Sequence, residues 1–467
     1  MLSRREIIAL LAASAAAPGL AFAEPAQPRL PWAAFRRTPD YPRLVEAVRR
    51  MKANPDASSP SSWSFWPMVH MHHCPHGQPY FLAWHRGYLH LFEAKLREIS
   101  GSVTLRVPYW DYFADPKLPV EFTAGNSTTN PLFEPRIGGE VGKALGFAAF
   151  APQITGFQRG ASAECFEAEV EAFHNKVHNL VGGRMATMLS PSDMIFWVHH
   201  ANVDRLWAAW SAAGEGRTMP GAGDAYWAGR FDYADGVSLA REAALDGAGL
   251  GYRYPDLKLP IGETAGAGAI RPGEVRVPHV PPPVRGAPVV VKPAPAQPAP
   301  APVEAPPPSG AVPVEMAPPM AMAAAPAPVP YRGIWLGGSR YQREPLRRSY
   351  EAGFAPDQVT IVLDQVSLSG AGQLGGYFYD LYLDLDGEER TLPECLLGSI
   401  GPFQIAAARH HSDDGMARIE LPVGEVIRRE AQGLELGDLG VVFARVETAG
   451  AAEGETIAIG SIEVAGG

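Results

Sequence analysis

Histidine is concentrated in a short part of this chain. Ten of the 13 histidines lie between His70 and His200, which is more than a protein core ordinarily needs. They fall into two groups, the first from His70 to His85 and the second from His174 to His200. Clustered imidazoles without matching cysteines suit copper, zinc, iron or nickel. The sequence therefore predicts a fold that assembles two metal sites with three histidines each.

The second group has the spacing of a helical metal site. His174 and His178 are four residues apart, so on a helix they share one face, with Cβ atoms about 6 Å apart. His200 lies in the segment IFWVHHANVDRLWAAW, whose apolar residues recur at helical spacing. A third ligand from this other helix would leave positions on the metal open for O2 or a substrate.

The first group is arranged differently. His85 begins an amphipathic helical pattern, WHRGYLHLFEAKLREI, and His76 precedes that pattern in an expected loop. Spacing alone leaves open whether His70 or one of its neighbours, His72 and His73, is the remaining ligand. In the second group, spacing alone likewise leaves open whether His199 or His200 is the third ligand.

Longer motifs around these histidines resemble one known family. The segments VGGRMATMLSPSD and FWVHHANVDRLW, after an HN-x-x-H pattern, closely resemble the second copper site of bacterial tyrosinases. CPHGQPYFLAWHRGYLHLFE resembles their first copper site, and VPYWDYF resembles a segment between the two. The resemblance covers roughly residues 63–210 and implies a mainly α-helical dicopper domain with a four-helix core. By it, the first copper is held by His70, His76 and His85, and the second by His174, His178 and His200.

The resemblance also implies an activity. Members of this family use two copper ions and O2 to oxidise o-diphenols to o-quinones, and many hydroxylate monophenols first. Small phenols are then the expected substrates. Diphenol-only catechol oxidases, o-aminophenol oxidases and the oxygen-binding hemocyanins share similar domains and remain alternatives.

Monophenol hydroxylation needs a proton acceptor near the second copper. Asn175 matches an asparagine that is thought, in tyrosinases, to hold a basic water together with a glutamate. Glu171 and Glu167 lie on the same face of an expected helix as His174, and we prefer Glu171.

The resemblance also implies roles for other residues near the two histidine groups. Asn179 and Met188 are expected to line the substrate pocket. Cys74 stands two residues before His76, as in fungal tyrosinases and molluscan hemocyanins, where the cysteine is joined to that histidine by a thioether. Backbone carbonyls are expected to orient ligand imidazoles, and Asp204 is expected to contact an arginine.

The ends of the chain differ from this central part. Residues 1–23 combine an Arg pair, an apolar stretch and an Ala-Phe-Ala end, which predicts a twin-arginine-like signal peptide and export from a bacterial cytoplasm. The dicopper domain is expected to occupy residues 24–270, followed by a Pro/Ala-rich extended linker over 271–330. No other stretch is long and apolar enough to span a membrane. The net charge of −10 argues against a nucleic-acid partner.

Residues 331–467 change to a β pattern. Four strand-like runs rich in Val, Ile and Tyr predict a small antiparallel β-sandwich. These runs are Val359–Val366, Gly376–Leu385, Leu439–Glu447 and Thr456–Val464. Their order resembles the shielding domain of plant polyphenol oxidases. That resemblance implies a latent enzyme, activated when a protease cuts the linker or the shield is displaced. Phe403 and Leu397 are the candidates to occupy the substrate position.

Overall fold

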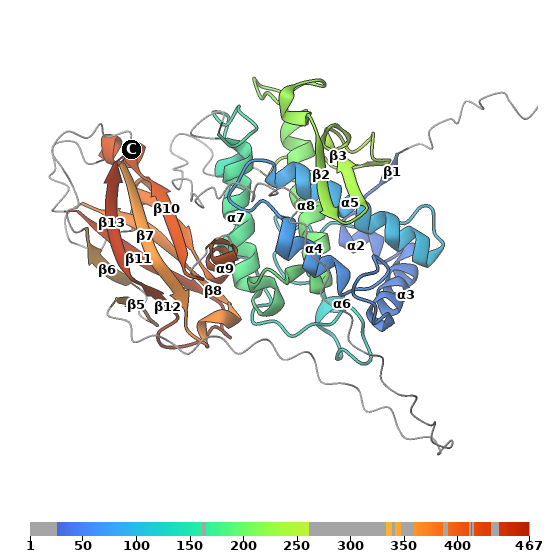
Figure 1. Cartoon of the computed structure of the whole chain (residues 1–467), viewed down its shortest axis with the longest axis horizontal. Coiled ribbons are helices and arrows are strands. Elements are labelled where there is room, and N and C mark those ends of the chain that lie inside the picture. The colour runs from blue at the N-terminus through green and yellow to red at the C-terminus, as the bar shows by residue number, and fades with distance from the viewer. Residues whose placement is uncertain are drawn as a thin grey trace, which may run out of the picture. The chain divides into compact units, whose positions relative to one another are not determined.

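The computed structural model describes residues 26–160 and 165–260, and residues 333–466 with several gaps (Figure 1). The gaps cover 339–340, 347–358, 386–390, 411, 413–414 and 431–438. The predicted signal peptide at 1–23 and the linker at 271–330 lie outside the described residues, so export and linker cleavage stay predictions. Within the described ranges, the search for a helix able to cross a membrane finds none.

The first part of the chain is mainly helical, as predicted. The histidines are carried by four helices and the loops between them, namely α4 (Phe65–His73), α5 (Phe81–Ser100), α7 (Phe166–Val181) and α8 (Met194–Ala212). Helix α3 (Asp40–Ala53) precedes them and packs against α5. Two short helices, α2 (Trp32–Phe35) and α6 (Val120–Thr123), complete this part.

Local sequence fixes the ends of the two central helices. Helix α8 begins after Asp193, whose side chain accepts a hydrogen bond from the backbone N–H of Ile195 and so caps the helix. Helix α5 ends at Gly101, which adopts the left-handed conformation (φ 69°) that glycine tolerates best. Nearly every residue of α8 is buried, so this helix forms the centre of the domain.

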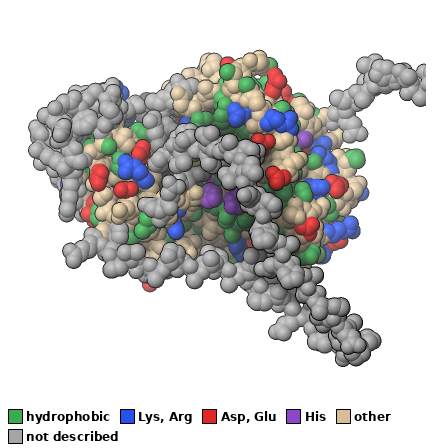
Figure 2. Space-filling model, viewed as in Figure 1, with side chains coloured by type: hydrophobic (Ala, Val, Ile, Leu, Met, Phe, Trp, Pro, Cys, Tyr) green, Lys and Arg blue, Asp and Glu red, His purple; other side chains and the backbone are tan. Residues whose placement is uncertain are grey.

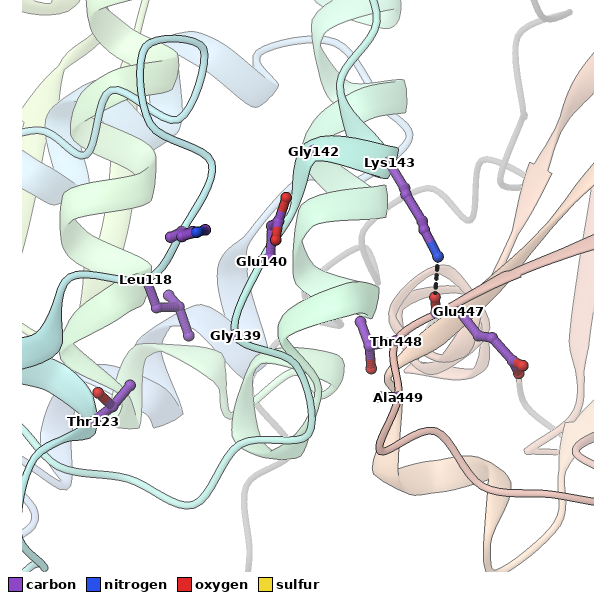
Figure 3. A pocket seen from close by; sticks show the side chains of 10 residues that line it. Leu118, Thr123, Gly139, Glu140, Gly142, Lys143, Glu447, Thr448 and Ala449 are labelled. Carbon is purple, nitrogen blue, oxygen red and sulfur yellow. Dashed lines mark hydrogen bonds between the residues drawn. The ribbon is translucent and has the colours of Figure 1, made fainter.

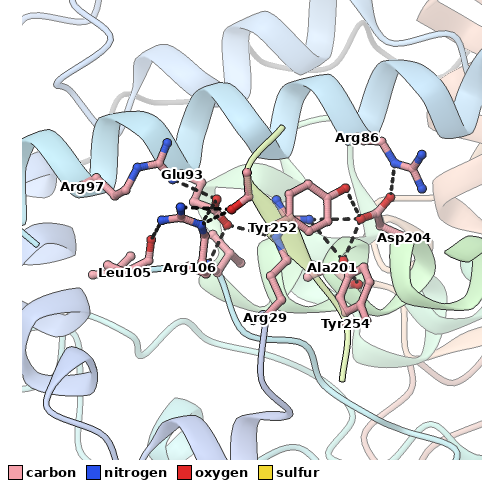
Figure 4. Close-up of polar contacts among 12 residues, drawn as sticks. Arg29, Arg86, Glu93, Arg97, Leu105, Arg106, Ala201, Asp204, Tyr252 and Tyr254 are labelled. Carbon is pink, nitrogen blue, oxygen red and sulfur yellow. Dashed lines mark hydrogen bonds and ion pairs between the residues drawn. The ribbon is translucent and has the colours of Figure 1, made fainter. Parts of the chain in front are cut away.

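A buried polar network holds α5 and α8 together (Figure 4). Arg29 is fully buried and donates to Glu93 on α5 (3.0 Å) and to Asp204 on α8 (3.1 Å). Asp204 also accepts from Arg86 (2.6 Å), as expected for an Asp–Arg contact, and from the Tyr252 hydroxyl (2.6 Å). Buried charges are tolerated only when they are paired and hydrogen-bonded. The network therefore fixes the relative position of the helices that carry two of the predicted ligands.

Short strand pairs support the same region. Strand β1 (Gln27–Pro28) pairs in parallel with β4 (Tyr252–Arg253), which brings Arg29 beside the tyrosines of the network. Strands β2 (Arg230–Ala234) and β3 (Val237–Ala240) form an antiparallel hairpin.

The C-terminal part is an antiparallel β-sandwich, which confirms the predicted fold class. One sheet has the order β10-β7-β12-β5, with β13 also paired to β7, and the other has the order β6-β11-β8-β9. Its strands are β5 (Ile334–Leu336), β6 (Tyr341–Pro345), β7 (Val359–Leu368), β8 (Tyr377–Asp384), β9 (Leu396–Ile400), β10 (Ala417–Pro422), β11 (Gly440–Glu447), β12 (Ile457–Ile459) and β13 (Ser461–Gly466). Two helices, α9 (Pro402–His410) and α10 (Gly424–Glu430), interrupt the strands.

The sequence-based prediction of the strands was incomplete. Three predicted runs correspond to β7, β8 and β11, whereas the fourth is divided at Gly460 into β12 and β13. Strands β5, β6, β9 and β10 were missed, because each is short and its apolar pattern is brief.

Candidate metal centre

The first histidine triad is built from two helices and the loop between them. His70 comes from α4, His76 from the loop, and His85 from the first turns of α5. The ring centroids of His70 lie 5.0 Å from His76 and 5.7 Å from His85, and the last two are 5.3 Å apart. All three side chains are buried. The structure thus brings together the three residues that the sequence assigned to the first copper.

The second triad comes from α7 and α8. The ring centroid of His174 lies 4.5 Å from that of His178, one helical turn away, and 4.7 Å from that of His200. The Nε2 atoms of His174 and His200 are 3.1 Å apart. In a tetrahedral site with metal–nitrogen bonds of about 2.0 Å, as for zinc, two such nitrogens lie about 3.3 Å apart. These two rings are therefore already placed as ligands of one ion.

The two triads face each other directly. The rings of His85 and His200 are stacked with centroids 4.3 Å apart and an angle of 12° between their planes. His76 and His174 are also stacked, at 6.0 Å. Two metal ions bound by these triads would therefore be close neighbours.

Backbone carbonyls orient the rings, as expected. The Nδ1–H of His70 donates to the carbonyl of Met188 (2.8 Å), and that of His178 donates to Met185 (2.7 Å). His85 donates in the same way to Phe81 (2.8 Å). A neutral imidazole that donates from Nδ1 keeps its lone pair on Nε2.

The Nε2 atoms themselves show what the centre can bind. Among the described residues, Nε2 of His70, His85 and His178 is buried and has no hydrogen-bond partner. Unsatisfied buried polar atoms are rare and costly. Burial lowers the pKa of His70 to about 3 and that of His85, His174, His178 and His200 well below the usual value. Neutral imidazoles with free lone pairs are the donor set that a copper ion requires, so the residues fit the predicted metal.

His199 lies beside the second triad. His174, His178, His199 and His200 could all reach one ion, because their ligand atoms lie within 4.8 Å of one another. The His199 ring stacks on His174 at 4.9 Å and lies 5.5 Å from Tyr112 of the VPYWDYF segment, whereas His200 stacks on the first triad. This difference supports His200 as the ligand.

Cys74 lies against the loop ligand of the first triad. Its Sγ atom is 3.0 Å from Nδ1 of His76, and the residue is buried. Burial raises the pKa of the Cys74 thiol well above its usual value, with Glu171 adding to that effect. The thioether itself stays a prediction, for which the two side chains are close enough.

The two candidate glutamates bind the loop that carries His76. Glu171 accepts from the N–H of Gly77 (2.7 Å) and pairs with Arg159 (2.6 Å). Glu167 accepts from the backbone N–H of Leu82 (3.1 Å) and of Arg159 (3.1 Å). Burial raises the pKa of Glu167 to about 7. Both carboxylates thus join α7 to the 77–82 segment, and Arg159 is a partner that no motif in the sequence indicated.

Asn175 contacts the metal centre directly. Its Oδ1 lies 3.1 Å from Nδ1 of the neighbouring His174, and its side chain is half-buried. Asn175 therefore orients His174 as the carbonyls orient the other rings. Its assignment to a basic water stays a prediction.

The two predicted pocket residues have other contacts. Asn179 is fully buried, donates to Gln404 (2.7 Å) and accepts from the N–H of Phe403 (2.8 Å), so it holds α9 of the β-sandwich. A Cβ at Gly401 would overlap the Asn179 side chain, so this approach requires glycine. Met188 is buried and acts on His70 through its carbonyl. Their part in a substrate pocket stays a prediction.

Phe403 lies over both triads. Its ring stacks on His178 at 4.0 Å and meets His76 edge-on at 5.0 Å. Leu397, the other candidate, was wrong, because its side chain belongs to the core of the β-sandwich. The sequence alone could not distinguish the two candidates, because it did not show that strand β9 (Leu396–Ile400) includes Leu397 and ends before Phe403.

Further contacts join the helical part to the sandwich. Lys176 on α7 pairs with Asp380 on β8 (2.7 Å) and lies 5.1 Å from the ring of Phe378. The backbone N–H of Gly376 donates to the carbonyl of Asn179 (2.7 Å). In a separate pocket, Lys143 donates to the carbonyl of Glu447 (2.9 Å), as Figure 3 shows.

Comparison with known proteins agrees with this geometry. The common central domain of tyrosinase matches residues 45–145 and 136–213. The tyrosinase of Streptomyces glaucescens is 34% identical over 206 residues, which make up 34% of this chain and 70% of that protein. This chain belongs to the tyrosinase family. It is an enzyme of the tyrosinase and polyphenol oxidase type.

Two other similarities are more limited than this one. Units Ode to Odg of the A-type hemocyanin of Enteroctopus dofleini are 32% identical over 227 residues, which make up 40% of this chain but 18% of that protein. The solved structure of latent apple tyrosinase covers 94% of this chain and 97% of its own, at 16% identity and a TM-score of 0.49. Membership of the tyrosinase family rests on the similarity in sequence.

Metal content provides a direct test of the ligand set. We expect the wild-type chain to bind two copper ions, and His178→Ala to lose about one of them, because its Nε2 has no substitute on α7. His199→Gln is the matched control and should keep both. Elemental analysis of the purified chains measures this, and full copper in His178→Ala or loss in His199→Gln would contradict the assignment.

The thioether is tested by mass spectrometry. We expect the peptide that contains Cys74 and His76 to be two hydrogen atoms lighter than its sequence after expression with copper and O2. Cys395, which is also buried, is the control thiol and should be alkylated in denatured protein. Alkylation of Cys74 in copper-loaded, denatured protein would mean that no crosslink forms.

Proposed function

We propose that this tyrosinase-family enzyme oxidises o-diphenols to o-quinones, hydroxylates monophenols, and is latent while its β-sandwich covers the metal centre. The observation that carries the proposal is the pair of facing, buried triads, in which Nε2 of His70, His85 and His178 has no hydrogen-bond partner among the described residues. Copper-dependent oxidation of phenols is the chemistry of this family. The substrate range and the latency are our additions.

The protein supplies geometry and a dry site. Two copper ions held by the triads would couple the reduction of O2 to the oxidation of a phenol. The backbone carbonyls of Phe81, Met185 and Met188 hold the ligand rings. The buried aromatic residues around the triads exclude water, which strengthens each electrostatic interaction inside the site.

Monophenols need one more function, since they must lose a proton on binding. Asn175 is half-buried beside His174, so it can reach both the ligand and a water molecule at the edge of the centre. We propose that this water takes the phenol proton. Glu171 and Glu167 are both engaged with the 77–82 segment, and we propose that Glu171, with Glu167 as the alternative, holds this water together with Asn175.

Latency is proposed from the position of α9. Phe403 stacks on a ligand ring where a planar phenol would stack, and Asn179 holds α9 there by accepting from the Phe403 N–H and donating to the Gln404 side chain. The linker keeps this helix at a high effective concentration, so modest contacts are enough. Cutting the linker makes the contact bimolecular and lets the sandwich dissociate.

The activity is tested on the linker-cleaved, copper-loaded chain. We expect it to oxidise both L-tyrosine and catechol, measured by quinone formation. Asn175→Ala should lower the monophenol rate by about 10²–10⁴-fold, the usual contribution of a positioned base, with a much smaller effect on catechol. The ratio of the two rates is the internal control.

Three results would contradict this assignment. If Asn175→Ala lowers both rates equally, Asn175 only supports His174. A wild-type chain that oxidises catechol alone is a diphenol oxidase, and one that oxidises neither while binding O2 is a carrier.

Latency is tested in the uncut chain. We expect Phe403→Ala to raise kcat/KM for catechol by at least about tenfold, since it empties the substrate position while the tether stays intact. Leu374→Ala removes an exposed apolar side chain of the same sandwich and is the control. Equal rates for cut and uncut chains with equal copper content would show that the sandwich does not cover the site.

A further inference from the structure

Three surface histidines near the metal centre belong to neither triad. His72 and His73 form the end of α4, and His410 forms the end of α9. All three are exposed, unlike the six ligands, and we call them the surface histidine cluster. Figure 2 shows histidine side chains gathered on one face of the molecule.

The spacing in this cluster is close to that in the triads. The ring centroids of His72 and His410 are 6.0 Å apart, and those of His72 and His73 are 6.5 Å apart. Within the two triads, the corresponding distances run from 4.5 Å for His174 and His178 to 5.8 Å for His178 and His200. Exposed side chains change rotamer readily, so a shift of about 1 Å brings His72 and His410 to the distance of two ligands.

The surroundings of the cluster also suit a cation. The exposed carboxylates of Asp232 and Asp235, on and beside β2, act electrostatically on His73. Imidazole is a good ligand for zinc, copper and nickel, and carboxylates can complete such a site.

The cluster is divided between the two parts of the chain. His72 lies two residues after the copper ligand His70, whereas His410 lies seven residues after Phe403. We propose that His72 and His410 bind one transition-metal ion of the zinc class at the surface, with His73 as a further donor, so that the ion joins α4 to α9. A bound ion would then hold Phe403 over the triads, and this consequence alone rests on the proposed latency.

The binding is tested with nickel on the copper-loaded full-length chain, in which the triads are filled. We expect equilibrium dialysis to show one additional Ni²⁺ per chain. Loss of a residue that only hydrogen-bonds to a metal ligand lowers metal affinity by about 10–100-fold. Loss of a direct ligand should cost at least as much, so we expect His72→Gln and His410→Gln each to lower nickel affinity by at least about tenfold. His90→Gln, on α5 and outside the cluster, is the control, and copper content should be equal in all four chains.

A second measurement tests the connection between the helices. Nickel should slow amide hydrogen exchange in residues 402–410 of the wild-type chain but not of His72→Gln. Neither measurement depends on catalysis, so a chain that lacks latency can still bind the ion. The proposal is overturned if no additional nickel binds, if either variant binds as the wild type does, or if nickel leaves the exchange of 402–410 unchanged.

Discussion

Three hydrogen bonds from histidine Nδ1 to backbone carbonyls are the interactions on which the metal centre depends. They turn the Nε2 lone pairs of His70, His85 and His178 toward the centre and fix the neutral tautomer. Two of the carbonyls belong to the loop after α7, so the shape of that loop sets the direction of two ligands. Gly182 permits the shape: its φ is 68°, and a Cβ there would come within 2.8 Å of Ile137.

Helix α7 connects the metal centre to the β-sandwich. One part of its surface carries His174 and His178, and Glu167 and Glu171 fasten it to the loop that holds His76. The same helix binds the sandwich through Lys176 and through Asn179 at its C-terminal end. Displacement of the sandwich therefore changes the environment of a ligand-bearing helix, and the histidines beside α9 give a metal ion a way to act on the same contact.

The charged network around Arg29 serves a different purpose. It costs desolvation energy, and it contains no group that contacts the triads. Its value lies in geometry, because Glu93 and Asp204 stand on α5 and α8, the helices that place His85 against His200. Arg29, Arg86, Glu93 and Asp204 each have an oppositely charged partner, although Nη2 of Arg29 is buried without a hydrogen bond, and this pairing favours one arrangement of those helices over others.

The sequence by itself determined the ligand types, the helices that carry them and the division into a helical and a β part. These follow from local patterns: the four-residue spacing of His174 and His178, the apolar periods of α5 and α8, and the long alternating runs of β7, β8 and β11. Tertiary structure alone decided how the side chains meet. No local pattern could show that Asn179 would bind Gln404, that Arg159 would pair with Glu171, or that Phe403 rather than Leu397 would lie over the histidines. Such contacts join residues far apart in the chain or depend on the exact end of a strand, and only packing of the whole chain fixes them.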